Sequence, residues 1–499
     1  MKNEQLKFDF DPRFSEVPIH SVLKPNAYKG LAGFHKYWGK KPTECWNFLI
    51  TQLTRENELV IDPFLGSGLI TREAADLKRR FIGIDINPFS VELTKLFMEL
   101  PQANEYKKAL AALRDEVKHE IDACYMLSDG RIASHYLWEG DSLKLIWCKP
   151  CNGRKKEELP PSEFDVELFQ KHSRYQPENM RALSFFDNSR INTSKNLTIN
   201  DLFTGRALRN IDSILYSVKK HSDILLRRAL SLTLTASLGQ MSNMVFAVTH
   251  RGKTSGRNSG KTEVGSWVIG YWRPKLHFEI NVWNCFENKA KKLIKAISEL
   301  NGSTSVRYSE NVSDVFNTDV KIALSEGDAK SVFAQLPDSC ARLILTDPPH
   351  GDRIPYLELS EMWNSVLGKP VDFEQEIVIS NAKERGKTTE NYNESISEFL
   401  VECGRVMTND GCLAIIFNAK KKDHWNSLES IEKITPGLRY AGCFPMNYSA
   451  GSVVQDNRKG GLKQDYILLF CKTDSEKKIS EIRRKFSSLP NWKDGSSLQ

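Results

Sequence analysis

One stretch of the 499-residue sequence carries residues that could do chemistry: LILTDPPHGDRIPY, from Leu343 to Tyr356. It begins as an apolar run with the length of a buried strand, and the prolines after Asp347 stop a helix or a sheet ladder from continuing. Because proline has no N–H group, carbonyl oxygens beside Asp347 are left to accept hydrogen bonds from a ligand. The alternative is a turn that only ends a strand. The stretch predicts a carboxylate and a rigid carbonyl presented together at a sheet edge.

A second stretch predicts a binding site for a nucleoside. Residues 59–61 have the composition of a buried strand, and a turn with Gly66 and Gly68 leads from them into a predicted helix over 70–77. Glycines let the backbone approach a ligand closely, although a short Gly-x-Gly often marks only a tight turn. The next strand ends at Asp85, an acid that can accept hydrogen bonds from both hydroxyls of a ribose or cap the following helix. Taken together, the turn and the acid favour nucleoside binding.

Four segments of the chain together resemble motifs of the S-adenosylmethionine-dependent amino-group DNA methyltransferases. They are KKP at 40–42, DPFLGSG at 62–68, FIGIDINP at 81–88 and TDPPHGDRIPY at 346–356. Four motifs in one order are far more specific than any one of them. The resemblance covers roughly residues 30–105 and 320–475, and it implies S-adenosylmethionine as the cofactor. The cofactor-binding residues that it implies are Lys41, Pro42, Asp62, Phe64, Gly66, Gly68, Asp85 and Asp328.

The same resemblance implies how a methyl group would reach an exocyclic amine of DNA. Asp347 and the Pro348 carbonyl would accept hydrogen bonds from the amine, with Pro349 fixing the backbone, once the base has left the duplex. In the family an aromatic ring follows the two prolines and stacks on the base, whereas this chain has His350 there. Histidine stacks with less area, so Tyr356 is expected to share the task.

The first residue of this motif indicates the target base. In the family, the cytosine-N4 enzymes more often begin this motif with Ser, so the resemblance favours adenine N6 for a motif that begins with Asp. Cytosine N4 and RNA are alternatives with the same core, and so is a module that binds the cofactor and DNA without turnover. DNA is the implied partner, and the sequence leaves open whether a cognate restriction or defence nuclease accompanies it.

The motifs predict a doubly wound, Rossmann-like α/β methyltransferase sheet that is interrupted by a largely helical inserted recognition region. Residues 1–105 would form a lead-in and the cofactor-binding half, and residues 306–475 the catalytic half. Between them, residues 106–305 would be the insertion, with apolar residues at helical spacing in its middle. Residues 476–499 would form a charged C-terminal tail.

The insertion contains a glycine-rich basic loop that could follow DNA phosphates. The basic residues of this loop are Arg251, Lys253, Arg257 and Lys261. From 251 to 300, ten Lys and Arg stand against four Asp and Glu, so most of the chain's net charge of +7 is local to this region. We predict that the insertion recognises the DNA target; the alternative is a solvated loop beside a packed helix.

Cys148 and Cys151 form a CxxC pair that resembles half of a zinc ribbon. Two sulfurs are only half of the four ligands that a structural zinc needs, and the partner cysteines of the ribbon are missing. Cys124, His135 or His172 would have to complete the set. We therefore predict no metal site.

Composition and charge are those of an ordinary globular protein, with 40% hydrophobic and 27% charged residues. The ten cysteines are scattered, which suits reduced thiols better than a disulfide framework. The N-terminus lacks an apolar signal core, and no apolar run approaches the roughly 20 residues of a membrane span. These features predict a soluble, cytoplasmic protein.

Overall fold

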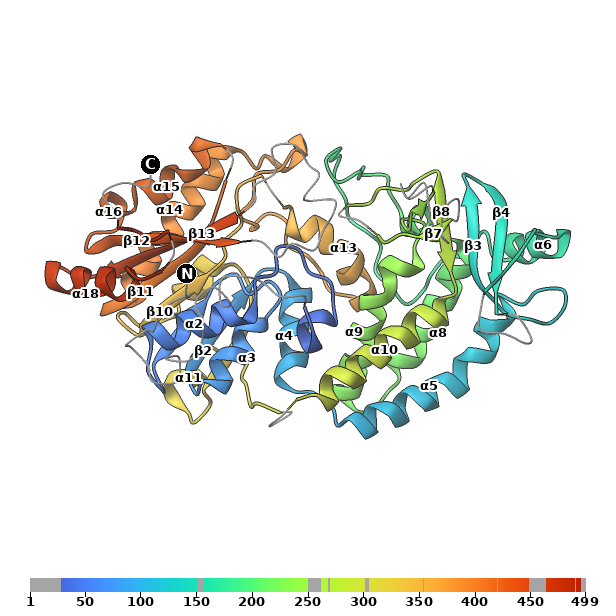
Figure 1. Ribbon diagram of the computed structural model, residues 1–499, viewed down its shortest axis with the longest axis horizontal. Helices are drawn as coiled ribbons and strands as arrows, with labels where there is room; N and C mark the ends of the chain where they lie inside the picture. Colours follow the sequence, from blue (N-terminus) through green and yellow to red (C-terminus); the bar gives the residue numbers. More distant parts are fainter. Residues whose placement is uncertain are drawn as a thin grey trace, which may run out of the picture.

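The computed structural model describes residues 28–149, 156–249, 262–267, 270–300, 305–352, 354–419, 421–447, 464–489 and 491–494. Within these residues the centre of the fold is an eight-stranded, mostly parallel sheet (Figure 1). Across the sheet the strands are β14 (Lys493–Asp494), β12 (Leu438–Asn447), β13 (Gln464–Lys472), β11 (Met407–Phe417), β10 (Ala341–Thr346), β1 (Leu59–Asp62), β2 (Arg80–Asp85) and β9 (Ile322–Glu326). The strands from β9 to β11 are parallel, and β13 lies antiparallel between β11 and β12.

The central strands are apolar throughout because helices cover both faces of the sheet. Val60 and Leu343 belong to one hydrophobic core, whereas Ile61 and Ile344 belong to the other. Successive side chains of a strand point to opposite faces, so a strand covered on both sides has no polar face. Helices of the first core are α2 (Thr43–Leu53), α3 (Leu69–Asp76), α4 (Pro88–Met98), α13 (Tyr356–Leu367) and α18 (Glu476–Phe486). Those of the second are α11 (Asp314–Asn317), α12 (Ala329–Phe333), α14 (Thr389–Val406), α15 (Asn426–Glu429) and α16 (Ile431–Ile434).

The connections create a binding crevice at the carboxyl ends of the central strands. From β1 the chain passes through α3 to β2 on one side, and it later returns through β10 to the other side of β1. Open α/β sheets bind ligands at such a switch point. Asp62 and Asp85 end β1 and β2, and Asp347 directly follows β10. The strand order therefore brings together three acids that are far apart in the sequence.

Between α4 and β9 the chain builds a second part, which lies on the right in Figure 1. Its helices are α5 (Ala103–Ala123), α6 (Glu163–Lys171), α7 (Ile199–Leu202), α8 (Gly205–Lys219), α9 (Ile224–Met241) and α10 (Val282–Ser298). It also holds an antiparallel sheet in the order β5 (Glu157–Leu159), β4 (Ser142–Cys148), β3 (Ala133–Glu139) and β8 (Leu276–Ile280). The predicted α/β class with a mostly parallel central sheet is confirmed. The prediction of a largely helical inserted region omits this second sheet.

The two parts share one hydrophobic core rather than meeting across a polar interface. The ring of Trp363 in α13 stacks on Trp38 at 4.7 Å and meets Trp267 of the second part edge-on at 5.9 Å. Aromatic side chains contribute large buried areas, so this contact fixes the second part against the helix that follows Asp347.

The end of the described chain packs onto the large sheet. Helix α18 buries Ile479 and Phe486, and β14 pairs with β12. The remaining short elements are η2 (Gly30–Gly33), β6 (Ala247–Val248), β7 (Glu263–Val264), η3 (Lys383–Arg385) and η4 (Lys422–Trp425). Among the residues that the structure describes, no helix has the length and apolar character to cross a membrane.

Candidate active site

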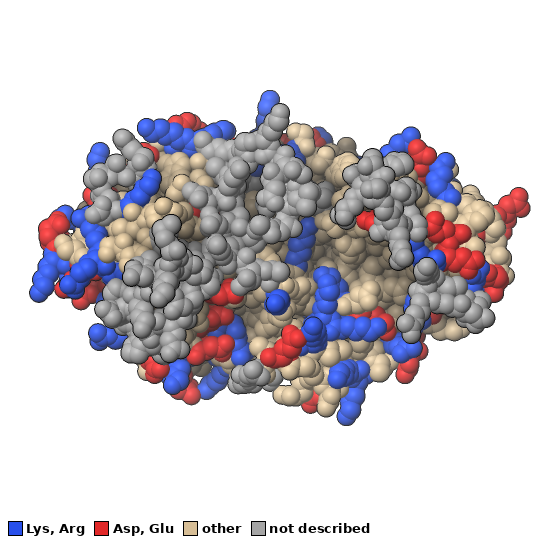
Figure 2. Space-filling view, in the orientation of Figure 1, with Lys and Arg blue, Asp and Glu red and all other residues tan. Residues whose placement is uncertain are grey.

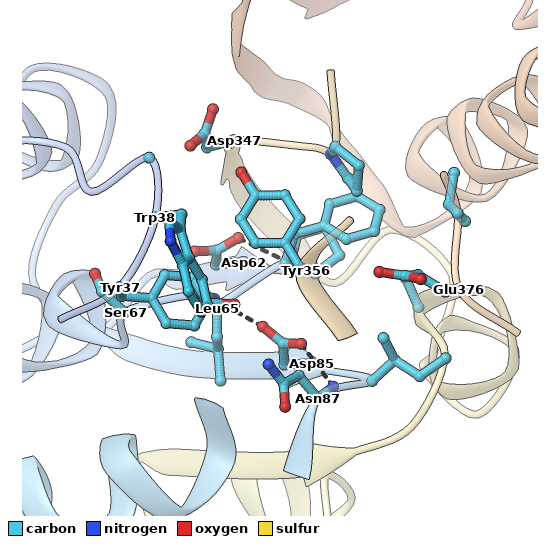
Figure 3. A pocket seen from close by; sticks show the side chains of 18 of the residues that line it. Tyr37, Trp38, Asp62, Leu65, Ser67, Asp85, Asn87, Asp347, Tyr356 and Glu376 are labelled. Atoms are coloured by element: carbon cyan, nitrogen blue, oxygen red, sulfur yellow. Dashed lines mark hydrogen bonds between the residues drawn. The ribbon is translucent and has the colours of Figure 1, made fainter. Parts of the chain in front are cut away.

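A pocket lies at the carboxyl ends of β1, β2 and β10 (Figure 3). The residues of its lining that the sequence predicts are Lys41, Asp62, Phe64, Gly66, Asp85, Asp328, Asp347, Pro349 and Tyr356. Four other predicted site residues, Pro42, Gly68, Pro348 and His350, are not part of this lining. The structure thus brings both predicted halves of the site into one cavity.

The glycine turn has two glycines with different tasks. Gly66 has a φ of +53° and lines the pocket, and its N–H donates to Asp85 Oδ2 at 2.7 Å. Gly68 has a φ of +71°, and a Cβ there would lie 2.0 Å from Thr94 Oγ1 of α4. Gly68 is therefore needed for close packing of the turn against α4, whereas Gly66 exposes backbone to the pocket.

Asp85 is held as a hydrogen-bond acceptor by two backbone groups. Oδ2 accepts from Gly66, and Oδ1 accepts from the N–H of Asn87 at 2.8 Å. The N-cap of α4 is Asn87, which accepts from Phe89 N, so the alternative role of Asp85 as a helix cap is wrong. Burial raises the pKa of Asp85 to about 6, although the two backbone hydrogen bonds oppose this shift.

Asp62 ties the ends of two strands together. Its Oδ1 accepts from Phe64 N at 3.1 Å and from Thr346 Oγ1 at 2.8 Å, and Thr346 is the last residue of β10. Burial raises the pKa of Asp62 to about 8. Two buried carboxyl groups with raised pKa values therefore stand in one pocket, which favours a ligand that brings hydrogen-bond donors or positive charge.

Asp347 is contacted by a cation and an imidazole. Lys41 Nζ donates to Oδ2 at 2.6 Å, and His350 Nε2 lies 2.9 Å from Oδ1. The backbone after Asp347 is fixed as well, because the Tyr392 hydroxyl donates to the Pro349 carbonyl at 2.6 Å. The carboxylate is therefore held in one orientation at the edge of the pocket.

His350 and Tyr356, the two predicted stacking residues, lie in different places. His350 is 7% exposed and is not part of the pocket lining. Its ring packs edge-on against Phe417, with ring centroids 4.9 Å apart. Tyr356 lines the pocket and stacks on Tyr37, with ring centroids 5.9 Å apart. Of the two rings, only that of Tyr356 borders the cavity.

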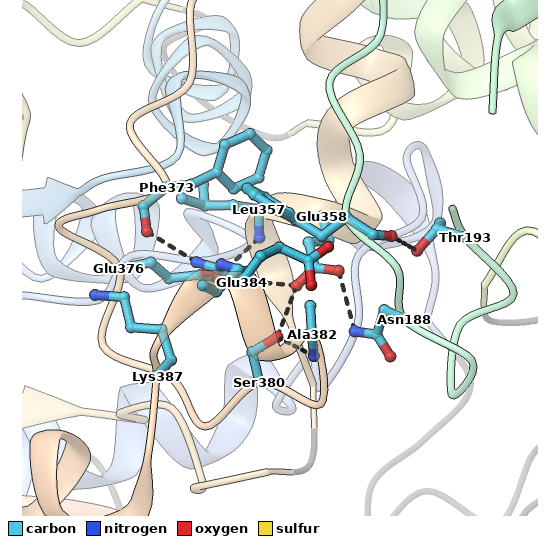
Figure 4. A network of polar contacts seen from close by, with 12 residues as sticks. Asn188, Thr193, Leu357, Glu358, Phe373, Glu376, Ser380, Ala382, Glu384 and Lys387 are labelled. Atoms are coloured by element: carbon cyan, nitrogen blue, oxygen red, sulfur yellow. Dashed lines mark hydrogen bonds and ion pairs between the residues drawn. The ribbon is translucent and has the colours of Figure 1, made fainter. Parts of the chain in front are cut away.

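A network of buried charges fixes α13, the helix that begins at Tyr356 (Figure 4). Arg385 donates to Glu358 Oε1 and to Glu376 Oε2, each at 2.8 Å, while Asn188 Nδ2 donates to Glu358 Oε2 at 3.0 Å. Glu376 borders the pocket and accepts from Leu357 N at 3.0 Å. The second part of the molecule thus contacts the helix beside the site through Asn188.

A second buried acid of α13 is held by the same segment of the chain. Arg181 forms a bidentate pair with Glu361, at 2.7 Å and 2.8 Å, and Ser184 N donates to the same carboxylate at 2.7 Å. Bidentate pairs of this kind are strong and fix orientation. Residues 181–188 therefore hold α13 at two positions.

Sequence reasoning missed several residues of the lining. They include Tyr37, Trp38, Asn87, Gln375 and Glu376. Asn87 lies inside the motif at 81–88, and Tyr37 and Trp38 lie just before the motif at 40–42. Glu376 reaches the pocket only through the fold, so no local pattern indicates it.

Some predicted residues lie outside the described part of the chain. These are Arg251, Lys253, Arg257 and Lys261 of the basic loop, and Cys151 of the CxxC pair. Cys148 is buried in β4. In the described ranges, no three His, Cys, Asp or Glu side chains are grouped so that they could hold a metal ion.

Comparison with known proteins adds a family to this geometry. Residues 4–96 match a family described as DNA methylase. A type II methyltransferase of Methanocaldococcus jannaschii, M.MjaII, is 27% identical over 115 residues, which are 23% of this chain and 21% of the relative. M.HindIII of Haemophilus influenzae is 32% identical over 81 residues, 16% of this chain and 26% of the relative. M2.LlaDCHI of Lactococcus lactis subsp. cremoris is 36% identical over 64 residues, 12% of this chain and 24% of the relative.

The similarity is local, since the chain spans only about a fifth to a quarter of the length of each of these relatives. The matched family segment contains Lys41, Asp62, the glycine turn and Asp85, which are residues that the pocket assembles or that support it. The comparisons confirm the predicted resemblance: this chain is similar to the amino-group DNA methyltransferases.

Proposed function

We propose that this chain transfers a methyl group from S-adenosylmethionine to an exocyclic amine of a flipped DNA base, with adenine N6 as the favoured target. One observation carries the proposal: Asp347, at the end of β10, lines the same pocket as Asp85, at the end of β2. A carboxylate suited to an amine and a carboxylate suited to a ribose thus share one cavity. The similarity to DNA methyltransferases supports this assignment.

The residues of the pocket fit an adenosyl cofactor. Asp85 has lone pairs left after its two backbone hydrogen bonds and would accept from the ribose hydroxyls. Phe64 and Ala329 supply apolar surface for the adenine, beside Asp328 at the start of α12. When bound, S-adenosylmethionine supplies a methyl group that its sulfonium already activates.

The chain's own task is then to position the amine and to exclude water. Asp347 and the Pro348 carbonyl would accept from the two N–H groups of the amine, drawing the nitrogen toward tetrahedral geometry and stabilising its developing positive charge. The Pro349 carbonyl already accepts from the Tyr392 hydroxyl, so we assign the Pro348 carbonyl, rather than that of Pro349, to the substrate amine. Tyr356 would stack on the flipped base.

The test is incubation of the chain with DNA and a methyl-labelled cofactor, followed by sequencing that reads modified bases. Label on adenine N6 supports the proposal. Label on cytosine N4 shows that cytosine is the target base instead, and label on RNA alone shows that RNA is the substrate instead of DNA. Binding of cofactor and DNA without any label contradicts turnover and favours a non-catalytic binding module.

Cofactor binding is expected to strengthen as pH rises. The sulfonium and the ribose hydroxyls of S-adenosylmethionine would stabilise the deprotonated carboxylates of the pocket. Binding therefore lowers the pKa values of these carboxyl groups and releases their protons. Protonation of Asp85, whose pKa is about 6, should by itself lower the affinity about tenfold between roughly pH 7 and pH 5. Protonation of Asp62, whose pKa is about 8, should lower the affinity further from about pH 8 downward. Calorimetry in two buffers of different ionisation enthalpy measures affinity and proton release together.

The matched control for this pH dependence is Asp85→Asn, which cannot titrate. This variant should lose the share of the pH dependence that Asp85 causes and keep the share that Asp62 causes. An affinity that is constant from pH 5 to pH 8, or that rises toward acid, contradicts the assignment of these carboxylates to the cofactor.

Basic groups beside the pocket support a DNA partner. Lys40 lines the pocket and donates to Ala32 O at 2.8 Å, and Lys289 of α10 donates to Phe34 O at 3.3 Å. Burial, and then repulsion from Lys289, lowers the pKa of Lys40 to about 7. Figure 2 shows Lys and Arg side chains along the middle of one face, between the two parts of the molecule. A polyanion laid across this face would stabilise the charged lysines.

We propose that the inserted region, 106–305, recognises the DNA target, with the basic loop on the phosphates. Replacing Arg251, Lys253, Arg257 and Lys261 by glutamine should weaken DNA binding and reduce the slope of log affinity against log salt by about four. The matched control replaces four exposed basic residues that lie elsewhere: Arg307, Lys330, Arg439 and Lys478. Equal slopes for both variants contradict a phosphate contact by this loop.

A further inference from the structure

A second acid lies behind the catalytic carboxylate. Asp465, near the start of β13, is wholly buried, and its Oδ2 lies 3.4 Å from Lys41 Nζ. Its Oδ1 lies 3.9 Å from His350 Nδ1. Lys41 and His350 also contact Asp347, at 2.6 Å and 2.9 Å. Two carboxylates therefore share the same cation and the same imidazole.

The surroundings of His350 fix its tautomer. Nε2 lies 2.9 Å from Asp347 Oδ1 and 3.0 Å from the carbonyl oxygen of Ile416. Both of these oxygens can only accept when Asp347 is ionised, so Nε2 carries the hydrogen. The N–H of His350 is therefore shared between Asp347 Oδ1 and the Ile416 carbonyl, and His350 is not part of the pocket lining.

The other oxygen of Asp347, Oδ2, accepts a hydrogen bond from Lys41, which also lies close to Asp465. Lys41 lines the pocket and donates to Oδ2, the oxygen that a substrate amine would approach from the cavity. An ammonium on Oδ2 competes with that amine for the same lone pairs. Because Asp465 lies 3.4 Å from the same ammonium, a shift of about an ångström would exchange one carboxylate partner for the other.

We propose that His350 and Asp465 are positioning residues for Asp347: one keeps its Oδ1 hydrogen-bonded to the protein, and the other makes its Oδ2 available to the substrate amine. His350 fixes Oδ1, and Asp465 draws Lys41 away from Oδ2 when the target amine arrives. This inference rests on the proposed function. It also gives His350 a role other than stacking, because its ring packs on Phe417 and contributes nothing to the lining.

A double-mutant cycle tests the role of Asp465. In single-turnover methyl transfer at saturating cofactor and DNA, Asp465→Asn should lower the rate about 30-fold when Lys41 is present. In a chain that also carries Lys41→Gln, the same change should lower the rate less than about threefold, because no ammonium then blocks Oδ2. Equal losses in both backgrounds overturn the proposal, because the effect of Asp465 on the rate would then not depend on Lys41.

The matched control for the cycle is Asp212→Asn. Asp212 is also a buried acid, and it accepts from Tyr175 and from two backbone N–H groups far from the pocket lining. This variant should retain the wild-type transfer rate. A comparable loss of melting temperature in the two variants, with a loss of rate only in Asp465→Asn, supports the proposal.

Two single variants test His350 without relying on the cycle. His350→Gln keeps an N–H donor and loses the ring, whereas His350→Phe keeps a ring and loses the donor. We expect the glutamine variant to retain about ten times more of the single-turnover rate than the phenylalanine variant, with similar KM for DNA. A phenylalanine variant at least as fast as the glutamine variant restores the stacking role and overturns the proposal.

The His350 tautomer can be read without turnover. In a 15N-histidine spectrum, the signal that disappears in His350→Gln should show a protonated Nε2 in the wild-type chain, and a bare Nε2 overturns the assignment. If the wild-type chain transfers no methyl group, the proposed function fails while this spectrum still decides the state of His350.

Discussion

Asp347→Ala is expected to lower methyl transfer about a thousandfold while cofactor affinity stays within about threefold of wild type. The substitution removes the acceptor for the substrate amine, and it leaves the Pro348 carbonyl alone to hold a nitrogen that needs two partners. Lys41 would then pair with Asp465, which already lies 3.4 Å away, so the variant does not strand a buried cation. Single-turnover transfer of a labelled methyl group, with cofactor affinity measured in parallel, separates the chemical step from binding.

Asp352→Ala is the matched control for this result. Asp352 follows Asp347 by five residues and pairs with Lys421 at 3.4 Å, outside the pocket lining. Its loss should leave transfer within about twofold of wild type. If Asp347→Ala keeps a tenth or more of the wild-type rate, the carboxylate does not hold the amine and the reaction needs another acceptor.

Asp85→Ala is expected to weaken cofactor binding about a hundredfold. Hydrogen bonds from two ribose hydroxyls to one carboxylate together contribute about 3 kcal/mol, which corresponds to that loss. The substitution also leaves the N–H groups of Gly66 and Asn87 without their present acceptor. Calorimetric titration with S-adenosylmethionine measures the affinity, and thermal melting of the ligand-free chain measures the cost to the fold.

Two further variants test whether the loss of affinity is specific to the Asp85 carboxylate. Asp85→Asn keeps one acceptor and should lose about tenfold in affinity. Asp76→Ala removes a half-exposed acid of α3 that pairs with Arg72, and it should not change cofactor binding. Equal affinities for Asp85→Ala and Asp76→Ala would show that the ribose is held elsewhere.

The strand ends and the glycine turn could be predicted from the sequence because their signals are local. An apolar run that stops at an acid marks Asp62, Asp85 and Asp347, and the structure places all three in one lining. Parallel pairing of β1 with β2 and β10 is what brings them together. Local pattern and strand order were therefore sufficient for the carboxylates of the site.

The contacts of His350 could not be predicted in the same way. Its position in the motif indicated a stacking ring, but its partners Ile416 and Asp465 come from β11 and β13, more than sixty residues further along the chain. The second sheet escaped prediction for a similar reason, because β8 pairs with β3 across some 140 residues. Long-range pairing has no local signature in a single sequence.

The contacts between residues 181–188 and α13 constrain how the sequence of this protein can evolve. Arg181 and Asn188 are the partners of Glu361 and Glu358, two acids with no exposed surface, in the helix that begins with Tyr356. A buried carboxylate that loses its cation costs several kcal/mol, so Arg181 and Glu361 cannot change independently, whereas Glu358 would keep Arg385 if Asn188 were lost. Descendants that acquire a new inserted region must therefore keep a cation at the place of Arg181 or replace Glu361 of α13 together with it.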